Sequence, residues 1–237
     1  THDVDSASRY KFCTKSKLIK QIALNFYQEK SLKNILQAFE IANSKELEIS
    51  INDPHNTFDW IMDAAEKNSN VSTFNFFGGK TNLRFDANYD LDNPTIRALI
   101  KKINGRGHLI GLHPSFNTYL DEEAFMKESK KLKSICKKEG IRQTIWGGRM
   151  HYLRWKWPET ALLWEKANLN YDSTLSFAHR PGFRCGTSHE YQLFDPVKKN
   201  PLNIKERPLI VMECSVISNS YLNLGYSEKA LEVILDL

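Results

Sequence analysis

The stretch GHLIGLHPSFN at residues 107–117 places a short apolar run between glycines and ends it with a histidine before a proline. An apolar run of this length, bounded by turn residues, is typical of a buried strand. His113 therefore lies at the carboxyl end of a predicted strand, where an imidazole can ligate a divalent metal or shuttle protons. His108 lies at the start of the same strand, at the opposite end of the sheet, where a structural role is favoured.

Apolar runs on both sides of this stretch predict further buried strands. They cover Val71–Phe77, Arg142–Trp146 and Pro208–Cys214. Helical patterns alternate with these runs at residues 58–65, 94–103, 121–139, from Pro158 onward, and over a long segment within 14–43. Strands that alternate with helices imply an α/β domain with a parallel sheet. At 237 residues the two candidates are a doubly wound sheet and a (β/α) barrel.

Titratable residues lie at the carboxyl ends of four strands. Asp3 and Asp5 follow what would be the first strand, His113 closes the strand at 108–112, Arg149 and His151 follow the run at 142–146, and Glu213 closes the run at 209–212. In such folds the carboxyl ends of the strands gather at one edge of the sheet, where active sites form. Four titratable strand ends therefore indicate a site at that edge, and this placement slightly favours the barrel.

The opening motif THDVD at residues 1–5 contains two carboxylates two residues apart. In an extended chain Asp3 and Asp5 point to the same side, and charges that close repel unless a cation or an arginine neutralises them. A metal would let one carboxylate ligate while the other stays free as a base. The plainer alternative is a solvent-exposed turn. His2 is a further candidate ligand, although an extended chain points it to the other side.

The motif GGRMHYLRW at residues 147–155 follows another predicted strand. Arg149 is placed to pair with a catalytic aspartate and to hold that carboxylate ionised. Arg154 lies among Tyr152, Trp155 and Trp157, which form either a packing cluster or a platform for the face of a sugar.

Composition narrows the possible function classes. Hydrophobic residues at 41% and charged residues at 26% are ordinary for a globular protein, and no apolar run is long enough to span a bilayer. A formal charge of +5 raises the question of nucleic-acid binding, but the basic cluster at 127–138 has the spacing of a solvated helix face. No nucleic-acid motif, nucleophile elbow, phosphate-binding loop or dinucleotide fingerprint is present. Four cysteines without a C-x-x-C pair mildly favour a reducing compartment.

Taken in order, these motifs resemble the polysaccharide deacetylases with a NodB-type domain (carbohydrate esterase family 4), and most of all the subgroup associated with bacterial surface-polysaccharide genes. The motifs that carry the resemblance are THDVD (1–5), DPHNTFDWIMD (53–63), GHLIGLHPSFNTY (107–119), GGRMHYLRW (147–155), NYDSTLSFAHRPGFRCGT (170–187) and PLIVME (208–213). The resemblance implies one catalytic domain over residues 1–237, folded as a distorted (β/α) barrel, usually of seven strands. We expect this domain to be an excerpt of a longer chain.

The resemblance also implies roles for residues in the first two motifs. Asp3 matches the general base and Asp5 matches a metal ligand. His113 matches the first histidine of a ligand pair, but Asn117 stands where the second histidine belongs. Zinc in a hydrolase prefers three protein ligands and a water. The amide oxygen of Asn117 or the imidazole of His151 would therefore have to supply the third ligand.

The later motifs complete the implied site. Arg149 matches the arginine that orients the base, and Asp172 matches the aspartate of the fourth motif. The histidine that usually acts as general acid on the final strand is replaced by Glu213, which suits this role only if burial raises its pKa. The candidate substrate-binding residues are Tyr152, Arg154 and Trp155.

The leading hypothesis is a metal-dependent hydrolase that removes N-acetyl groups from a sugar or polysaccharide precursor, with zinc as the expected cation and cobalt or nickel as alternatives. The cysteines and the resemblance favour a cytoplasmic location, and the oligomeric state stays open. Two alternatives remain. One is a metal-free carbohydrate-binding relative without catalysis, which absence of bound metal together with glycan binding would select. The other is an amidohydrolase that acts on a small non-sugar amide.

Overall fold

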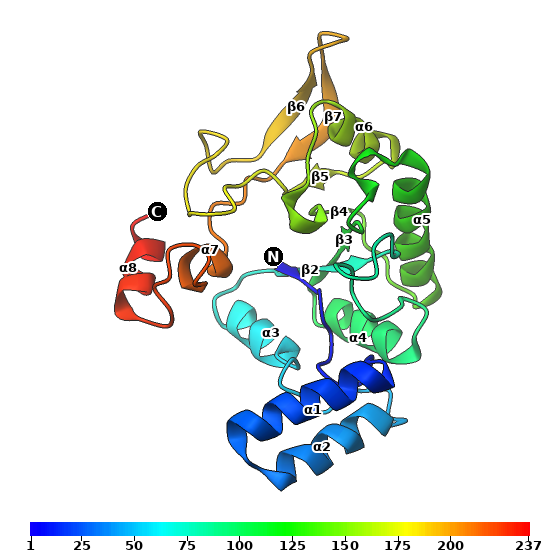
Figure 1. The fold of residues 1–237 in the computed structure, drawn as a ribbon. Coiled ribbons are helices and arrows are strands. Elements are labelled where there is room, and N and C mark those ends of the chain that lie inside the picture. Colours follow the sequence, from blue (N-terminus) through cyan, green and yellow to red (C-terminus); the bar gives the residue numbers. More distant parts are fainter.

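The structure is a computed structural model of residues 1–237, in which the backbone of every residue and all side chains except those at positions 25, 26, 28 and 29 are described. One mostly parallel sheet has the strand order β1-β2-β3-β4-β5-β7-β6 (Figure 1). The strands are β1 His2–Asp3, β2 Thr73–Phe77, β3 Leu109–His113, β4 Gly147–Gly148, β5 Tyr171–Asp172, β6 Tyr191–Asp195 and β7 Asn200–Glu206. Neighbours run parallel except β6 and β7, which are antiparallel.

The sheet is open. β1 and β6 form its two edges, and no ladder joins these two strands in the described chain. The predicted closure into a barrel is therefore not confirmed, although the first five strands follow one another in the consecutive order of a barrel. The consecutive order ends after β5, because β5 pairs with β7 and β6 lies outside β7. β6 and β7 form a hairpin that projects from the rest of the molecule at the top of Figure 1.

Two of the predicted strands lie where the sequence placed them. β2 is buried at every residue and pairs in register with β3 from Thr73–Leu109 to Phe77–His113. The prediction for residues 142–146 is wrong, because this segment has no ladder and β4 begins only at Gly147. Instead, the side-chain amide of Gln143 bonds both the N–H and the carbonyl of Ile110, at 2.8 Å each, and so replaces the backbone ladder.

The prediction of a strand over 208–214 is also wrong. This segment is half-buried, has no ladder and leads into helix α7 (Glu213–Ile217). The strand of this region comes earlier, as β7, in which exposed and buried residues alternate. An alternating strand covers the core with one face only and lacks the continuous apolar run that suggested a strand at 208–214.

The predicted helices are present as α3 (Phe58–Lys67), α4 (Pro94–Gly105), α5 (Glu122–Lys138) and α6 (Glu159–Lys166). α4 begins as the sequence predicts. The side chain of Asn93 accepts the N–H of Thr95, and Pro94 occupies the first turn, where its missing N–H costs no hydrogen bond. The last helix is α8 (Glu228–Leu235).

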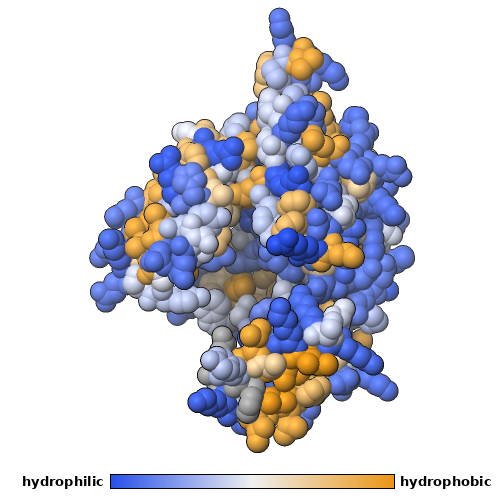
Figure 2. Space-filling view, in the orientation of Figure 1, coloured by the Kyte–Doolittle hydropathy of each residue, from blue (hydrophilic) through white to orange (hydrophobic). Residues whose placement is uncertain are grey.

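The long pattern within 14–43 forms two helices, α1 (Lys15–Glu29) and α2 (Leu32–Asn43). The chain turns between them because Lys30 has a φ of 50° and Ser31 caps the N-terminus of α2. These helices have a small core of their own, separate from the main core under the sheet. They form the lower end of the molecule in Figure 1, where Figure 2 shows apolar side chains at the surface. Among the described residues no helix is long and apolar enough to cross a membrane.

Candidate metal centre and active site

Three potential metal ligands meet at the carboxyl edge of the sheet. Asp5 follows β1, His113 ends β3, and His151 begins the short 3-10 helix η2 (His151–Leu153) just after β4. The strands of this part of the sheet are parallel, so their carboxyl ends lie at the same edge. One ligand atom from each of the three residues lies within 4.8 Å of the other two. The fold thus brings together three residues that the sequence marked as candidate ligands.

The two histidines turn the same nitrogen toward Asp5. The Nε2 atoms of His113 and His151 lie 3.3 and 3.8 Å from Oδ1 of Asp5. Nδ1 of His113 lies 2.6 Å from the carbonyl oxygen of Arg149. Because a carbonyl only accepts hydrogen bonds, the neutral imidazole of His113 carries its proton on Nδ1 and presents the lone pair of Nε2 to Asp5.

Asp86 faces the nitrogen of His151 that is turned away from Asp5. The sequence did not predict this contact, because no motif or spacing connects the two residues. Oδ1 of Asp86 lies 3.4 Å from Nδ1 of His151, and the Asp86 side chain is fully buried. Three backbone N–H groups donate to this carboxylate, those of Thr81, Asn82 and Phe116. A carboxylate behind a histidine selects the tautomer whose other nitrogen is free to ligate.

The donor set fits a divalent cation of the zinc, cobalt or nickel type. It consists of two imidazoles and one carboxylate, and the distances of 3.3 and 3.8 Å from the Asp5 oxygen to the two histidine nitrogens suit bonds of about 2.0–2.2 Å to a common ion. Burial and the neighbouring His113 lower the pKa of His151, which favours the neutral imidazole that a metal requires. Burial also acts to lower the pKa of His113, but the carboxylates of Asp3 and Asp5 outweigh it and raise that pKa.

Asp3 lies beside this centre and is held by two side-chain hydrogen bonds. Asn75 donates from Nδ2 to Oδ1 of Asp3 over 2.7 Å, and Arg149 donates from Nη1 to Oδ2 over 3.1 Å. Burial disfavours the carboxylate, but the charges of His113 and Arg149 together with these hydrogen bonds lower the pKa of Asp3 to about 2. The predicted pairing of Arg149 with Asp3 is therefore present. Asn75 was missed, although a buried asparagine within the apolar strand β2 is a signal that could have found it.

Asp172 acts on this arrangement through its neighbours in the chain. Its two oxygens accept from the N–H and the hydroxyl of Thr174, at 2.9 and 2.6 Å. The same hydroxyl accepts the N–H of Met150, and Nε of Arg149 donates to the carbonyl of Ser173. Asp172 thus holds the turn at 172–174, to which Arg149 and Met150 are hydrogen-bonded, and no described contact joins its carboxylate to the three metal-ligand candidates.

Asn117, the other candidate for the third ligand, is occupied elsewhere. Its Nδ2 donates to the carbonyl of Thr81 over 3.1 Å, and its Oδ1 accepts from Nη1 of Arg154 over 3.3 Å. The amide therefore ties together two loops that border the site. His151 faces Asp5 instead, and it is the residue that completes the donor set.

Of the remaining predicted residues, Tyr152 borders the site, whereas Trp155 and Glu213 have no described contact with the metal ligands. Tyr152 is 62% exposed and its ring lies 4.6 Å from that of His151, so it borders the site. Trp155 stacks on Trp157 and packs against the main core, and no described contact joins it to the metal ligands. Glu213 is exposed at the start of α7. The burial that would suit Glu213 to act as a general acid is therefore absent.

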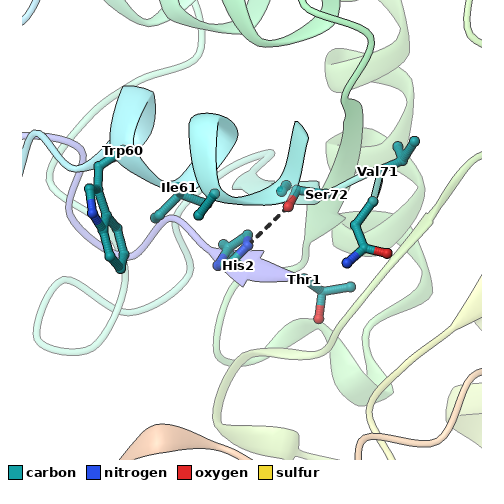
Figure 3. A pocket seen from close by; sticks show the side chains of 9 residues that line it. Thr1, His2, Trp60, Ile61, Val71 and Ser72 are labelled. Carbon is teal, nitrogen blue, oxygen red and sulfur yellow. Dashed lines mark hydrogen bonds between the residues drawn. The ribbon is translucent and has the colours of Figure 1, made fainter. Parts of the chain in front are cut away.

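His2 points away from the metal centre. Its Nε2 lies 3.3 Å from the hydroxyl of Ser72 (Figure 3). Its ring lies 5.1 Å from that of Phe74. Together with Trp60 and Ile61 of α3, His2 lines a cavity of about 460 Å³ at the β1 edge. The alternation of side chains along an extended chain explains why His2 and the two aspartates face opposite sides.

Fold and site together define an α/β protein with a candidate divalent-metal centre at the carboxyl edge of its sheet. Neither the known protein families nor the curated proteins contain a sequence match to this chain. The fold is similar to the crystal structure of a Mycobacterium smegmatis protein assigned as a polysaccharide deacetylase, with a TM-score of 0.54 and 16% identity over 99% of this chain and 68% of that chain. At this identity the similarity shows the fold.

Proposed function

We propose that this protein is a divalent-metal-dependent hydrolase that removes the acetyl group from an N-acetylated sugar, in the assembly of a surface polysaccharide. The observation that supports this proposal most strongly is the convergence of Asp5, His113 and His151 directly beside the Asp3–Arg149 pair. A ligand set next to a separately held carboxylate is what hydrolysis of an unactivated amide needs. The structural similarity to the Mycobacterium smegmatis protein agrees with this reaction class.

In the proposed reaction a bound cation and the side chains around it have separate roles. Asp5, His113 and His151 would hold the cation, which polarises the amide carbonyl and acidifies water when it is bound. Zinc is the expected ion, with cobalt or nickel as alternatives. Asp3 accepts the proton of the attacking water, and Arg149 with Asn75 keeps this carboxylate ionised and aimed.

The leaving amine needs a proton before the C–N bond breaks. Glu213 is exposed and no described contact joins it to the site, so the structure offers no support for it in this role. In this proposal Asp3, once it has taken the proton of water, returns that proton to the amine. A single carboxylate then acts first as base and afterwards as acid, and Asp172 positions it indirectly through the turn to which Arg149 is hydrogen-bonded.

The decisive experiment combines metal content with acetate release from acetamido sugars, on protein purified without chelator or nickel affinity. We expect near-stoichiometric metal in the wild type, loss of metal and activity in His151→Ala, and retention of metal in Asn117→Ala. His189→Ala, which removes an exposed histidine far along the chain, is the matched control. Wild-type protein that stays free of metal after incubation with zinc, cobalt and nickel would overturn the proposal, and glycan binding by such protein would select the non-catalytic carbohydrate-binding alternative.

A further inference from the structure

Three aromatic rings pack against one another beside His151; we call this cluster the aromatic ledge and define it as Phe85, Phe116 and Tyr152. The rings of Phe85 and Phe116 are stacked, with centroids 4.6 Å apart. The ring of Tyr152 meets both of them edge-on, at 5.4 and 5.5 Å. The ledge touches the metal centre, because the ring of His151 lies 4.6 Å from that of Tyr152 and the residue after Phe85 is Asp86.

The backbone under the ledge is in an unusual conformation. Tyr152 and Leu153 both have positive φ values, 57° and 51°, in the left-handed region that residues with a side chain rarely adopt. Strained backbone of this kind persists where the surrounding structure imposes it, and it collects at functional sites. Tyr152 is 62% exposed at the border of the metal centre.

Two arginines flank the ledge and bring positive charge that the described side chains do not neutralise. The guanidinium carbon of Arg154 lies 4.0 Å from the ring centroid of Phe116, and that of Arg84 lies 5.3 Å from the centroid of Phe85. Arg154 donates to a backbone carbonyl and to the amide oxygen of Asn117, which are both uncharged. Neither arginine has an ion pair with a carboxylate within 4.0 Å among the described residues.

We infer that the ledge binds the sugar that adjoins the N-acetylated residue, and that this neighbouring sugar carries an anionic group. This inference rests on the proposed deacetylase function, and it adds the substrate class. The exposed ring of Tyr152 suits the apolar face of a pyranose, whereas the guanidinium groups over Phe85 and Phe116 suit a carboxylate or a phosphate. The geometry of one ledge edged by two arginines therefore selects an acidic saccharide over a neutral one.

The experiment measures binding by calorimetry to the full chain at low salt. The probes are a hexasaccharide of alternating N-acetylglucosamine and glucuronate, the neutral N-acetylglucosamine hexamer, and N-acetylglucosamine 1-phosphate. We expect the acidic hexasaccharide to bind about 10-fold more tightly than the neutral hexamer, as one charge-assisted hydrogen bond implies. Arg84→Gln should remove this preference, and Arg142→Gln, which changes an exposed arginine outside the ledge, should retain it.

The outcomes separate this inference from the proposed function. Equal affinity for the two hexamers, an unchanged preference in Arg84→Gln, or no binding of either hexamer overturns the inference, even if the protein releases acetate. A preference that Arg84→Gln removes supports it, even if acetate release is absent and the proposed reaction fails. Tighter binding of the 1-phosphate than of the acidic hexasaccharide would identify the anion as a phosphate, and the reverse would identify it as a carboxylate.

Discussion

Glu206 is expected to hold a proton at neutral pH, and replacing it with glutamine tests this directly. Glu206 and Asp172 lie opposite each other on β7 and β5, and both side chains are fully buried. Oε1 of Glu206 accepts the N–H of Leu175, whereas its Oε2 has no donor among the described residues. The oxygens of Asp172 are already occupied by Thr174. A proton on Oε2 would let Glu206 donate to Asp172, and burial together with the Asp172 charge raises the pKa of Glu206 far above its ordinary value.

The effect on stability follows from the difference between the folded and the unfolded chain. In the unfolded chain Glu206 ionises near pH 4.5, whereas in the folded chain it stays protonated well above neutral pH. The unfolded chain therefore binds fewer protons, and the free energy of unfolding falls by about 1.4 kcal/mol per pH unit in this range. From pH 6.5 to pH 8.0 the loss due to Glu206 is about 2 kcal/mol. The amide introduced by Glu206→Gln stays neutral and can donate to Asp172, so this part of the pH dependence disappears.

Urea unfolding at pH 6.5 and pH 8.0 measures this contribution. The wild type should lose about 2 kcal/mol more than Glu206→Gln between the two pH values, because the variant has no carboxyl at position 206 that can hold a proton. Glu40→Gln, which changes an exposed glutamate on α2, should behave like the wild type. Equal losses in wild type and Glu206→Gln would show that Glu206 does not hold a proton in this pH range. They would also refute the hydrogen bond from Glu206 to Asp172.

Three further predictions test the centre and the sheet. Asp86→Asn should weaken metal affinity about 10- to 100-fold, as measured by chelator competition, because the amide no longer orients His151 as a carboxylate does. Unchanged affinity would contradict that role. Asp3→Asn should keep the metal and reduce the rate of acetate release by about 10²- to 10⁴-fold, and a loss of metal would instead make Asp3 a ligand. Gly148→Ala should destabilise the fold by about 3 kcal/mol or more, because its Cβ would lie 1.8 Å from the carbonyl oxygen of Leu112, whereas Gly105→Ala meets open space and should be nearly neutral in thermal unfolding.

Local signals explain the parts of this fold that can be predicted. The cap at Asn93 and the proline after it mark the start of α4, and the apolar runs mark β2 and β3, because each signal operates within a few consecutive residues. The same kind of signal placed His113 at a strand end. The same signal predicted a strand at 208–214 that the structure does not contain. A continuous apolar run forms a buried strand only when other elements cover both of its faces, and the run itself does not specify those neighbours.

The sequence by itself determined an α/β domain and the chemical types of the candidate site, namely aspartates and histidines at strand ends beside an arginine. Only the tertiary structure decided which of them meet. It brought His151, and not Asn117, beside Asp5 and His113, placed Asp86 next to His151, and left Glu213 exposed. The physical reason is that these contacts join residues far apart in the chain. Strand order and register set their distances, and no local propensity encodes either one.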